Sequence, residues 1–239
     1  MRLVGPLHAW NLTLQEAAAL QERLSRRLFL VPYCGWPRLV AGVDLSCESA
    51  ALAGRRISCQ AWGCAIVYEA ELLENRLRLH EVERAWAKGV LNFPYIAGLL
   101  SFREAPVLLE ALQKLTRTPD VVFCDAQGTA HPRGFGEACH LGLWMDLPSI
   151  GVAKSLLIGK AGAPGKRAGA WSPLRYQGRI VGAALRTREG TKPVYVSPGH
   201  RIDLESTIKL ALACCDGTRI PVPTREADRW SKELRMRHF

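Results

Sequence analysis

Three short apolar runs, each followed directly by a charged residue, constrain the fold of this chain more than any other feature. The runs are LVAGV before Asp44, VVFC before Asp125 and SIGVA before Lys154. Their length and their β-branched residues predict strands. Strand and helix patterns alternate through the middle of the chain, which is typical of an α/β domain with a mixed central sheet. We expect the charged residues to lie at strand ends, where the ligand sites of such sheets form.

The rest of the sequence predicts further elements in the same way. Helices are expected over residues 14–30, 97–115, 136–144, 204–214 and 224–236. Strands are expected over residues 38–46, 56–69, 72–82, 120–124, 149–153, 179–187 and 194–197. The residues around Asn75 fit either a turn or a bulge, and Pro106 must lie near the start of its helix or kink it. Residues 159–169 are rich in Gly, Ala and Lys and predict a flexible basic loop. No repeat or long linker divides the chain, so we expect a single catalytic domain over residues 1–239.

The charge of the chain favours a polyanionic partner. It holds 32 Lys and Arg against 22 Asp and Glu, a net charge of +10. Nucleic acid is the commonest such partner, although a merely basic protein has the same excess.

The eight cysteines form no CxxC pair, and no His follows at zinc-ligand spacing, so we expect no zinc site. No signal peptide and no apolar run of about 18 residues is present, which indicates a cytoplasmic protein with no membrane partner.

The two strand-end aspartates, Asp44 and Asp125, suggest a metal site. A half-buried carboxylate is costly unless a cation compensates it, and two carboxylates brought together repel each other. Mg²⁺ prefers a few carboxylates together with water and phosphate oxygens, which suits a phosphodiester enzyme. The alternative is that Asp44 caps a turn and Asp125 begins an Asx-type loop, because Asp often has these roles.

The segment FPYIAGLLSFRE, residues 93–104, places Tyr95 in a stiff loop before a helix. Enzymes that act beside an altered base use such side chains to fill the stack when the base leaves it. A hydrophobic staple at the helix N-terminus would produce the same pattern. Glu104 lies on the helix that follows and is placed to reach a metal held by strand-end aspartates.

The run DAQGTAHPRGFGEACH, residues 125–140, combines the strand-end acid Asp125 with two histidines, an arginine and several glycines. Glycines let a phosphate or a backbone approach closely, and His131 and Arg133 are natural phosphate contacts. His140 precedes LGLW on an expected helix, which favours a place in the core. Lys154 is suited to stabilising charge on a pentavalent phosphate or to orienting the attacking water.

Together these segments resemble the endonuclease V family of deoxyinosine-directed repair nucleases. The matching stretches are VAGVDLS (40–46), FPYIAGLLSFRE (93–104), DVVFCDAQGTAHPRGFGEACHLGL (120–143), SIGVAKSLL (149–157), SPGHRIDLEST (197–207) and PVPTREADRW (221–230). They occur in the family's order from residue 40 onward. The combination of PYIxGxLSFRE with D-x-x-G-x-AHPR is highly specific.

The resemblance implies an RNase H-like fold, with a mixed central sheet flanked by helices. It also implies Mg²⁺-dependent hydrolysis, with Mn²⁺ as a substitute, of the second phosphodiester bond 3′ to inosine, leaving 3′-hydroxyl and 5′-phosphate ends. By the same resemblance, the metal-site acids are Asp44, Glu104, Asp125 and Asp228. Lys154 and His131 then assist at the phosphate. The expected substrate contacts are the wedge residues Pro94, Tyr95, Ile96 and Gly98, together with Gly128 and Arg133.

Two departures from the family pattern bear on base recognition. Ala97 replaces the second proline of the usual PYIPG wedge, and Ala126 replaces the glycine that usually follows the metal-site aspartate. The substrate itself stays open between inosine-containing DNA and RNA. Two other functions also stay open: a structure-specific flap or mismatch nuclease on a similar scaffold, and a non-catalytic nucleic-acid-binding protein. We expect a monomer.

Overall fold

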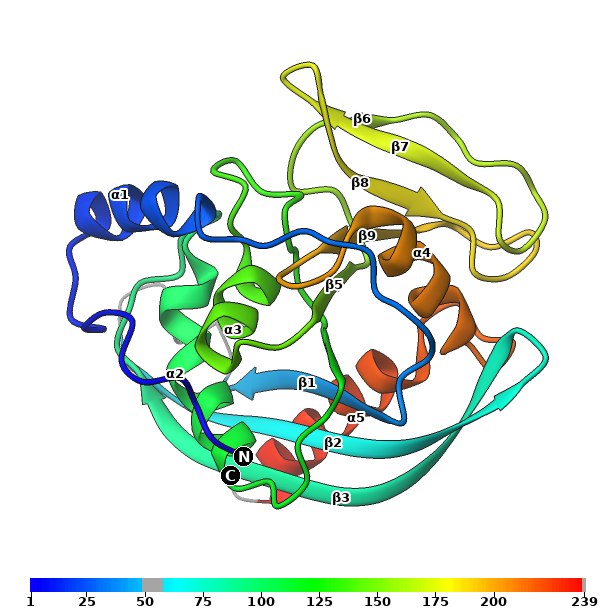
Figure 1. Ribbon diagram of the computed structural model, residues 1–239. Coiled ribbons are helices and arrows are strands. Elements are labelled where there is room, and N and C mark those ends of the chain that lie inside the picture. Colours follow the sequence, from blue (N-terminus) through cyan, green and yellow to red (C-terminus); the bar gives the residue numbers. More distant parts are fainter. Residues whose placement is uncertain (49–57, 238–239) are drawn as a thin grey trace.

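A mixed nine-stranded sheet organises the chain, in the strand order β3-β2-β1-β4-β5-β9-β8-β7-β6. The computed structural model describes residues 1–48 and 58–237. The central strands β1 (Leu39–Cys47), β4 (Val121–Cys124) and β5 (Ser149–Ala153) run parallel. The other pairings are antiparallel, and they join β2 (Cys59–Leu73), β3 (Arg76–Leu91), β6 (Lys160–Ala161), β7 (Trp171–Tyr176), β8 (Arg179–Leu185) and β9 (Val194–Pro198). The predicted mixed α/β sheet is therefore confirmed (Figure 1).

Helices cover both faces of this sheet because successive residues of a strand point to opposite sides. On β1, Ala41 and Val43 pack against α2 (Leu100–Gln113) and α3 (Glu137–Met145). Val40 points to the other face, into the cluster that includes residues of α4 (Leu204–Ala213). Helix α5 (Val222–Arg237) covers β2 through Trp230 and Leu234. The sheet thus forms the middle of three layers.

The N-terminal segment lies beside α2 and α3. Helix α1 (Leu14–Ser25) begins with a capping box between Thr13 and Glu16 and ends earlier than the predicted residue 30. His140 is fully buried, with Nδ1 3.0 Å from the Ser101 hydroxyl and Nε2 2.7 Å from Nε2 of His8. The predicted place of His140 in the core is confirmed.

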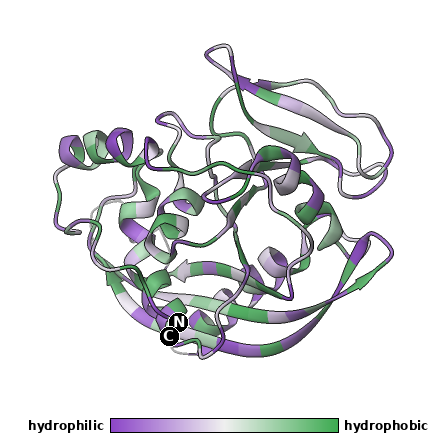
Figure 2. Cartoon of the chain, in the orientation of Figure 1, coloured by the Kyte–Doolittle hydropathy of each residue, from purple (hydrophilic) through white to green (hydrophobic). Residues whose placement is uncertain are grey.

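The long hairpin β2–β3 differs from the sequence prediction in its boundaries. The two strands pair continuously from Cys59 with Leu91 to Leu73 with Arg76, with one irregularity between Val67 and Tyr68. The predicted break after residue 69 is wrong, and so is the predicted strand end at residue 82, because cross-strand pairing carries both strands past these points. A turn joins them at Glu74, which has φ 57°. Figure 2 shows both hydrophobic and hydrophilic residues along the two strands. Because this mixture continues along their whole length, the sequence gives little indication of where each strand ends.

Three further elements depart from prediction. The short strand β6 lies within residues 159–169, which were predicted to form a loop. Strand β7 was not predicted, because its WSPLRY sequence contains Pro173, and proline is confined to edges and irregular positions of sheets. Helix α2 begins at Leu100 rather than at residue 97, because Gly98 has φ +80° and cannot continue a right-handed helix. Pro106 lies inside α2.

Residues 56 and 57 of the predicted strand 56–69 lie outside the described residues. Within the described part of the chain, no helix is long and apolar enough to cross a membrane.

Candidate active site

The register of the parallel strands brings Asp44 and Asp125 together. Val43 of β1 lies opposite Cys124 of β4, so the next residue in each chain is an aspartate. Asp125 directly follows β4, as predicted. Asp44 does not end its strand, because β2 continues to pair with β1 beyond it, up to Cys47. The two carboxylates therefore sit at neighbouring positions on the sheet.

Helix α5 adds a third carboxylate, Asp228, from the opposite end of the sequence. The helix approaches β1 closely at Gly42, where a Cβ atom would lie 2.0 Å from the carbonyl oxygen of Pro223. Only glycine permits this contact. As a result, one ligand atom from each of Asp44, Asp125 and Asp228 lies within 4.8 Å of the other two. These three are the one group of possible metal ligands found among the described residues.

Lysines balance part of this negative charge. Lys154 directly follows β5, as predicted, and its Nζ lies 2.5 Å from Oδ2 of Asp125 and 3.4 Å from Oδ1 of Asp228. Lys232 lies 2.8 Å from the other oxygen of Asp228. Burial lowers the pKa of Lys154, but the hydrogen bond and charge of Asp125 outweigh it, so the net pKa is raised. Lys154 therefore carries a full positive charge at neutral pH.

Burial disfavours the charged form of each aspartate. For Asp228 the hydrogen bonds and charges of Lys232 and Lys154 outweigh burial, so its pKa is lowered, whereas the pKa values of Asp44 and Asp125 are raised. Burial raises the pKa of Asp44 to about 7, against the opposing hydrogen bond from the Ser231 hydroxyl at 2.7 Å. The charges of Asp125 and Asp228 raise it further. Burial also raises the pKa of Asp125 in spite of Lys154. A divalent cation relieves this repulsion, and three carboxylates form a donor set that suits a hard, oxygen-preferring ion. The residues therefore fit a metal ion.

Glu104, the remaining predicted metal ligand, lies near enough for the charge of Asp44 to affect its pKa. Its carboxylate oxygens do not lie within 4.8 Å of all three aspartates, so it is not part of their group. It hydrogen-bonds to Glu137 on α3, and burial raises its pKa well above the ordinary value. Glu137 is an acid of the site that sequence reasoning missed. It is 7% exposed, and its Oε2 has no hydrogen-bond partner in the described structure. The sequence did contain an indication of this residue, because Glu137 is a second acid within the run 125–140.

The predicted wedge is an exposed aromatic ring on a fixed loop. Tyr95 is 77% exposed, and the loop continues to Gly98, just before α2. The carbonyl of Gly98 accepts hydrogen bonds from Nε2 of His131 at 2.9 Å and from Nη2 of Arg133 at 2.7 Å. The structure therefore places these two side chains against the wedge loop, whereas the sequence predicted phosphate contacts for them. Burial lowers the pKa of His131 to about 4, so its imidazole is neutral at neutral pH.

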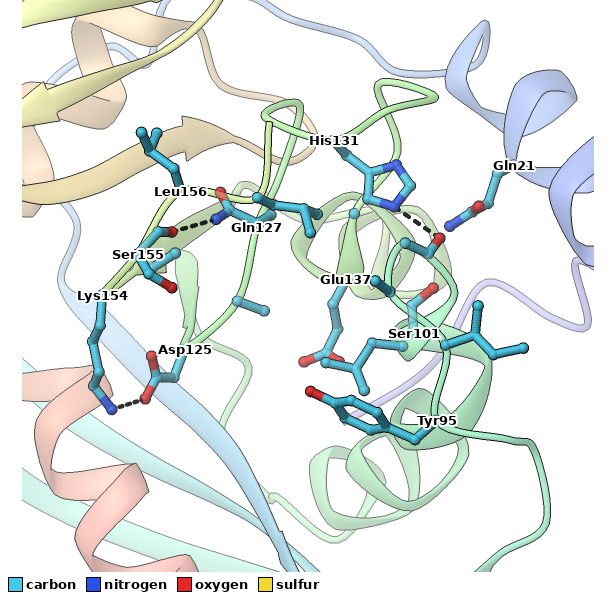
Figure 3. Close-up of a pocket in the computed structure, with 18 residues that line it drawn as sticks. Gln21, Tyr95, Ser101, Asp125, Gln127, His131, Glu137, Lys154, Ser155 and Leu156 are labelled. Carbon is cyan, nitrogen blue, oxygen red and sulfur yellow. Dashed lines mark hydrogen bonds and ion pairs between the residues drawn. The ribbon is translucent and has the colours of Figure 1, made fainter. Parts of the chain in front are cut away.

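A cavity of about 350 Å³ lies between the wedge loop and the aspartate group. Figure 3 shows Tyr95 and Glu137 on one side of it, and Asp125 with Lys154 on the other. Ile96 and Gly98 line it, as do the two departures from the family pattern, Ala97 and Ala126. Three predicted substrate contacts, Pro94, Gly128 and Arg133, do not line this cavity. Gly128 instead lies against β9, where a Cβ atom would be 2.1 Å from the carbonyl oxygen of Pro198.

Comparison with known proteins decides the family. The sequence model of the Endonuclease V family matches residues 22–229. The chain belongs to the endonuclease V family. It is 44% identical to the endonuclease V of Roseiflexus castenholzii, over 96% of this chain and 96% of that protein. The structure is similar to that of endonuclease V from Streptomyces avermitilis, with a TM-score of 0.85 and 39% identity over 96% of each chain.

Two more distant structures complete the comparison. Endonuclease V of Ciona intestinalis, in complex with a 24mer DNA that contains an inosine followed by a ribo-adenosine, matches with a TM-score of 0.77 and 25% identity, over 94% of this chain and 98% of that one. Aquifex aeolicus Argonaute matches in fold alone, with a TM-score of 0.50 and 14% identity over 84% of this chain and 29% of that one. The predicted RNase H-like α/β fold is confirmed, and the chain is an endonuclease.

Proposed function

We propose that this endonuclease hydrolyses the second phosphodiester bond 3′ to inosine in nucleic acid and leaves 3′-hydroxyl and 5′-phosphate ends, with the whole chain acting as one catalytic domain. One observation carries the proposal. Asp44, Asp125 and Asp228 converge within 4.8 Å beside the ammonium of Lys154, across a cavity from an exposed tyrosine. Asp125, from the proposed metal site, and Tyr95, which is able to replace a displaced base, thus line one pocket.

The metal in this proposal is Mg²⁺, with Mn²⁺ as a substitute, held by Asp44, Asp125 and Asp228, with Glu104 beside them. When bound, it supplies a Lewis acid that activates water and stabilises the leaving 3′ oxygen. Lys154 contributes a charged donor next to the same carboxylates, where it stabilises negative charge on the reacting phosphate. The exposed ring of Tyr95 fills the stack from which the base has left.

His131 has a different proposed role from the one suggested by its motif. Its Nε2–H donates to the Gly98 carbonyl, and its Nδ1 accepts from the backbone N–H of Arg133 at 3.2 Å. Both ring nitrogens are therefore engaged, and the ring is neutral. We assign His131 and Arg133 to holding the wedge loop in place, through which they act on the displaced base.

Inosine is the proposed target because the cavity wall combines backbone groups with small side chains. Gly98, Ala126 and Gln127 line it, and the absence of large side chains at Gly98 and Ala126 lets a displaced base approach the backbone closely. The Ciona intestinalis relative binds inosine-containing DNA, which supports the same substrate here. DNA is the proposed substrate, and RNA is the alternative. All eight cysteines are free thiols, which suits action in the reducing cytoplasm.

The test is a cleavage assay on matched DNA and RNA strands that each carry one inosine, with and without Mg²⁺. Cutting one nucleotide beyond the inosine is expected only with metal, and Asp125→Asn and Lys154→Ala should each reduce the rate by at least about 100-fold. Arg201→Gln is a suitable control, because Arg201 pairs with Asp146 on the surface. Flap and mismatched duplexes without inosine complete the set. Efficient cutting of these, or full activity of Asp125→Asn, would overturn the proposal.

A further inference from the structure

Residues 159–192, which we call the basic arm, form the outer edge of the sheet through β6, β7 and β8. In Figure 1 this arm projects from the body of the molecule at the top of the view. It begins just after the cavity-lining segment 154–157. Its far end is joined to the same segment by Arg219, whose guanidinium donates to the carbonyls of Lys154, Lys192 and Pro193 at 3.2, 2.9 and 2.9 Å. The base of the arm is therefore fixed beside the catalytic lysine.

The arm carries most of the excess charge of the protein. It contains eight Lys and Arg and one acid, Glu189, so this short stretch holds +7 of the total +10. Seven of the basic side chains are exposed: Lys160, Lys166, Arg167, Arg175, Arg179, Arg188 and Lys192. None of them forms an ion pair within the described residues. On α5, by contrast, Arg225 pairs with Asp216 and Lys232 with Asp228.

The remaining basic residue of the arm, Arg186, has a structural role: it holds the backbone of residues 164–170 in place. Its side chain donates to the carbonyls of Gly165 at 2.6 Å and Pro164 at 3.0 Å. Its backbone pairs with Gly169 and Ala170, at 2.8 Å in each direction. The predicted flexible basic loop, residues 159–169, is therefore tied to the end of β8. Because this backbone is already held in place, the arm loses less backbone entropy when it binds a partner.

We propose that the basic arm binds the phosphate backbone of the substrate duplex outside the cavity, on one side of the displaced base only. This inference rests on the proposed function for the identity of the substrate. The arm lies on the β5 side of the cavity, whereas the wedge loop with Tyr95 lies on the α2 side. A nucleic acid that enters the cavity therefore meets the arm in one direction along its axis.

The sheet gives the reach of this contact. Adjacent strands lie about 4.8 Å apart. β7 is the third strand from β5 and β6 the fourth, so the arm extends roughly 14–19 Å from β5. A duplex rises about 3.4 Å per base pair, so phosphates about four to six base pairs from the cavity should meet the arm. Shorter extensions should not gain from it.

Two charge-neutralised arm variants test the proposal, Lys166→Gln with Arg167→Gln, and Arg175→Gln with Arg179→Gln. Binding of an inosine-free duplex of about 30 base pairs is measured by fluorescence anisotropy in EDTA, between 50 and 200 mM salt. Each lost phosphate contact should reduce the slope of log K against log salt by about 0.9, so each double variant should lose about 1.8. The matched control is Arg78→Gln with Arg117→Gln, which removes the same charge from arginines paired with Glu71 and Glu69.

A length series then tests the direction. Duplexes with the inosine near one end are extended by 2 to about 12 base pairs on either side, and affinity should rise on one side only, beyond about four base pairs. That gain should disappear in the arm variants. An unchanged salt slope in both arm variants, an equal loss in the control, or equal gains on both sides would each overturn the proposal. Absence of any inosine preference would refute the proposed function and leave the arm result standing, because the salt series uses inosine-free duplex.

Discussion

Replacing Glu137 by Gln should stabilise the metal-free protein at neutral pH. Glu137 is buried against Glu104, one of its carboxylate oxygens has no hydrogen-bond partner among the described residues, and Asp44 and Asp125 add like charge. A buried acid in such a place destabilises the fold once it ionises. Glutamine keeps the shape of the side chain and removes the charge.

The pKa of Glu137 gives the sign and the size of the effect. Burial raises it from 4.5 to about 8, so between these pH values the folded protein binds a proton that the unfolded chain releases. Stability from this group is therefore present below about pH 4.5 and is lost as pH rises through about 8. A rise in pKa from 4.5 to about 8 corresponds to at most about 5 kcal/mol of unfolding free energy. Glu104 and the aspartates remain in the variant, so we expect a gain of about 2 kcal/mol at pH 8, or roughly 4–8 °C in Tm.

Urea unfolding in EDTA at pH 5, 6, 7 and 8 measures this gain. The difference between Glu137→Gln and the wild type should widen steadily as pH rises, and Mg²⁺ should narrow it by compensating the carboxylates in the wild type. Glu83→Gln is the control. Burial raises the pKa of Glu83, but the hydrogen bonds from the backbone N–H groups of Thr116 and Arg117 and from the Thr116 hydroxyl together outweigh burial, so the net pKa is lowered. That variant should lose stability at neutral pH. The reasoning would be refuted if the Glu137→Gln protein were less stable than the wild type at pH 8. It would also be refuted if the difference in unfolding free energy between the two proteins did not change with pH.

Three further predictions concern activity. Tyr95→Ala should weaken cutting of duplex by roughly 5- to 150-fold, the equivalent of about 1–3 kcal/mol of lost stacking, while Mn²⁺ binding measured by calorimetry stays unchanged. His131→Ala should act like Tyr95→Ala in the same two assays, because it frees the Gly98 carbonyl, and a selective loss of Mn²⁺ affinity would contradict this role. Mg²⁺ affinity, followed by titration calorimetry, should fall up to about tenfold per pH unit below about pH 7, because the ion competes with the proton on Asp44. An affinity that is flat from pH 5 to 8 would count against Asp44 as a ligand.

The central part of the fold was readable from the sequence because it is fully buried. β4 and β5 are short buried runs, and their ends at Cys124 and Ala153, directly before Asp125 and Lys154, were predicted at the right residues. The boundaries of β2 and β3 were not, because strands with one exposed face carry charged residues along their length, and only pairing with the neighbouring strand shows where they end.

The parts of the site that the sequence did not predict depend on contacts between distant segments. The proposed role of His131 rests on its hydrogen bond to the Gly98 carbonyl, 33 residues away, and no local pattern predicts that partner. Glu137 reads locally as an acid in the first turn of a helix, a common and favourable place for one. Only the packing of α3 beside α2 shows that it faces Glu104.

The position of α5 has a consequence for the order in which the site assembles. Strands β1, β4 and β5 precede α5 in the sequence, so the ribosome makes them before the helix that supplies Asp228 and covers Gly42. A nascent chain can therefore build most of its sheet while it still lacks the third aspartate. The group of three aspartates therefore forms only after α5 docks against β1.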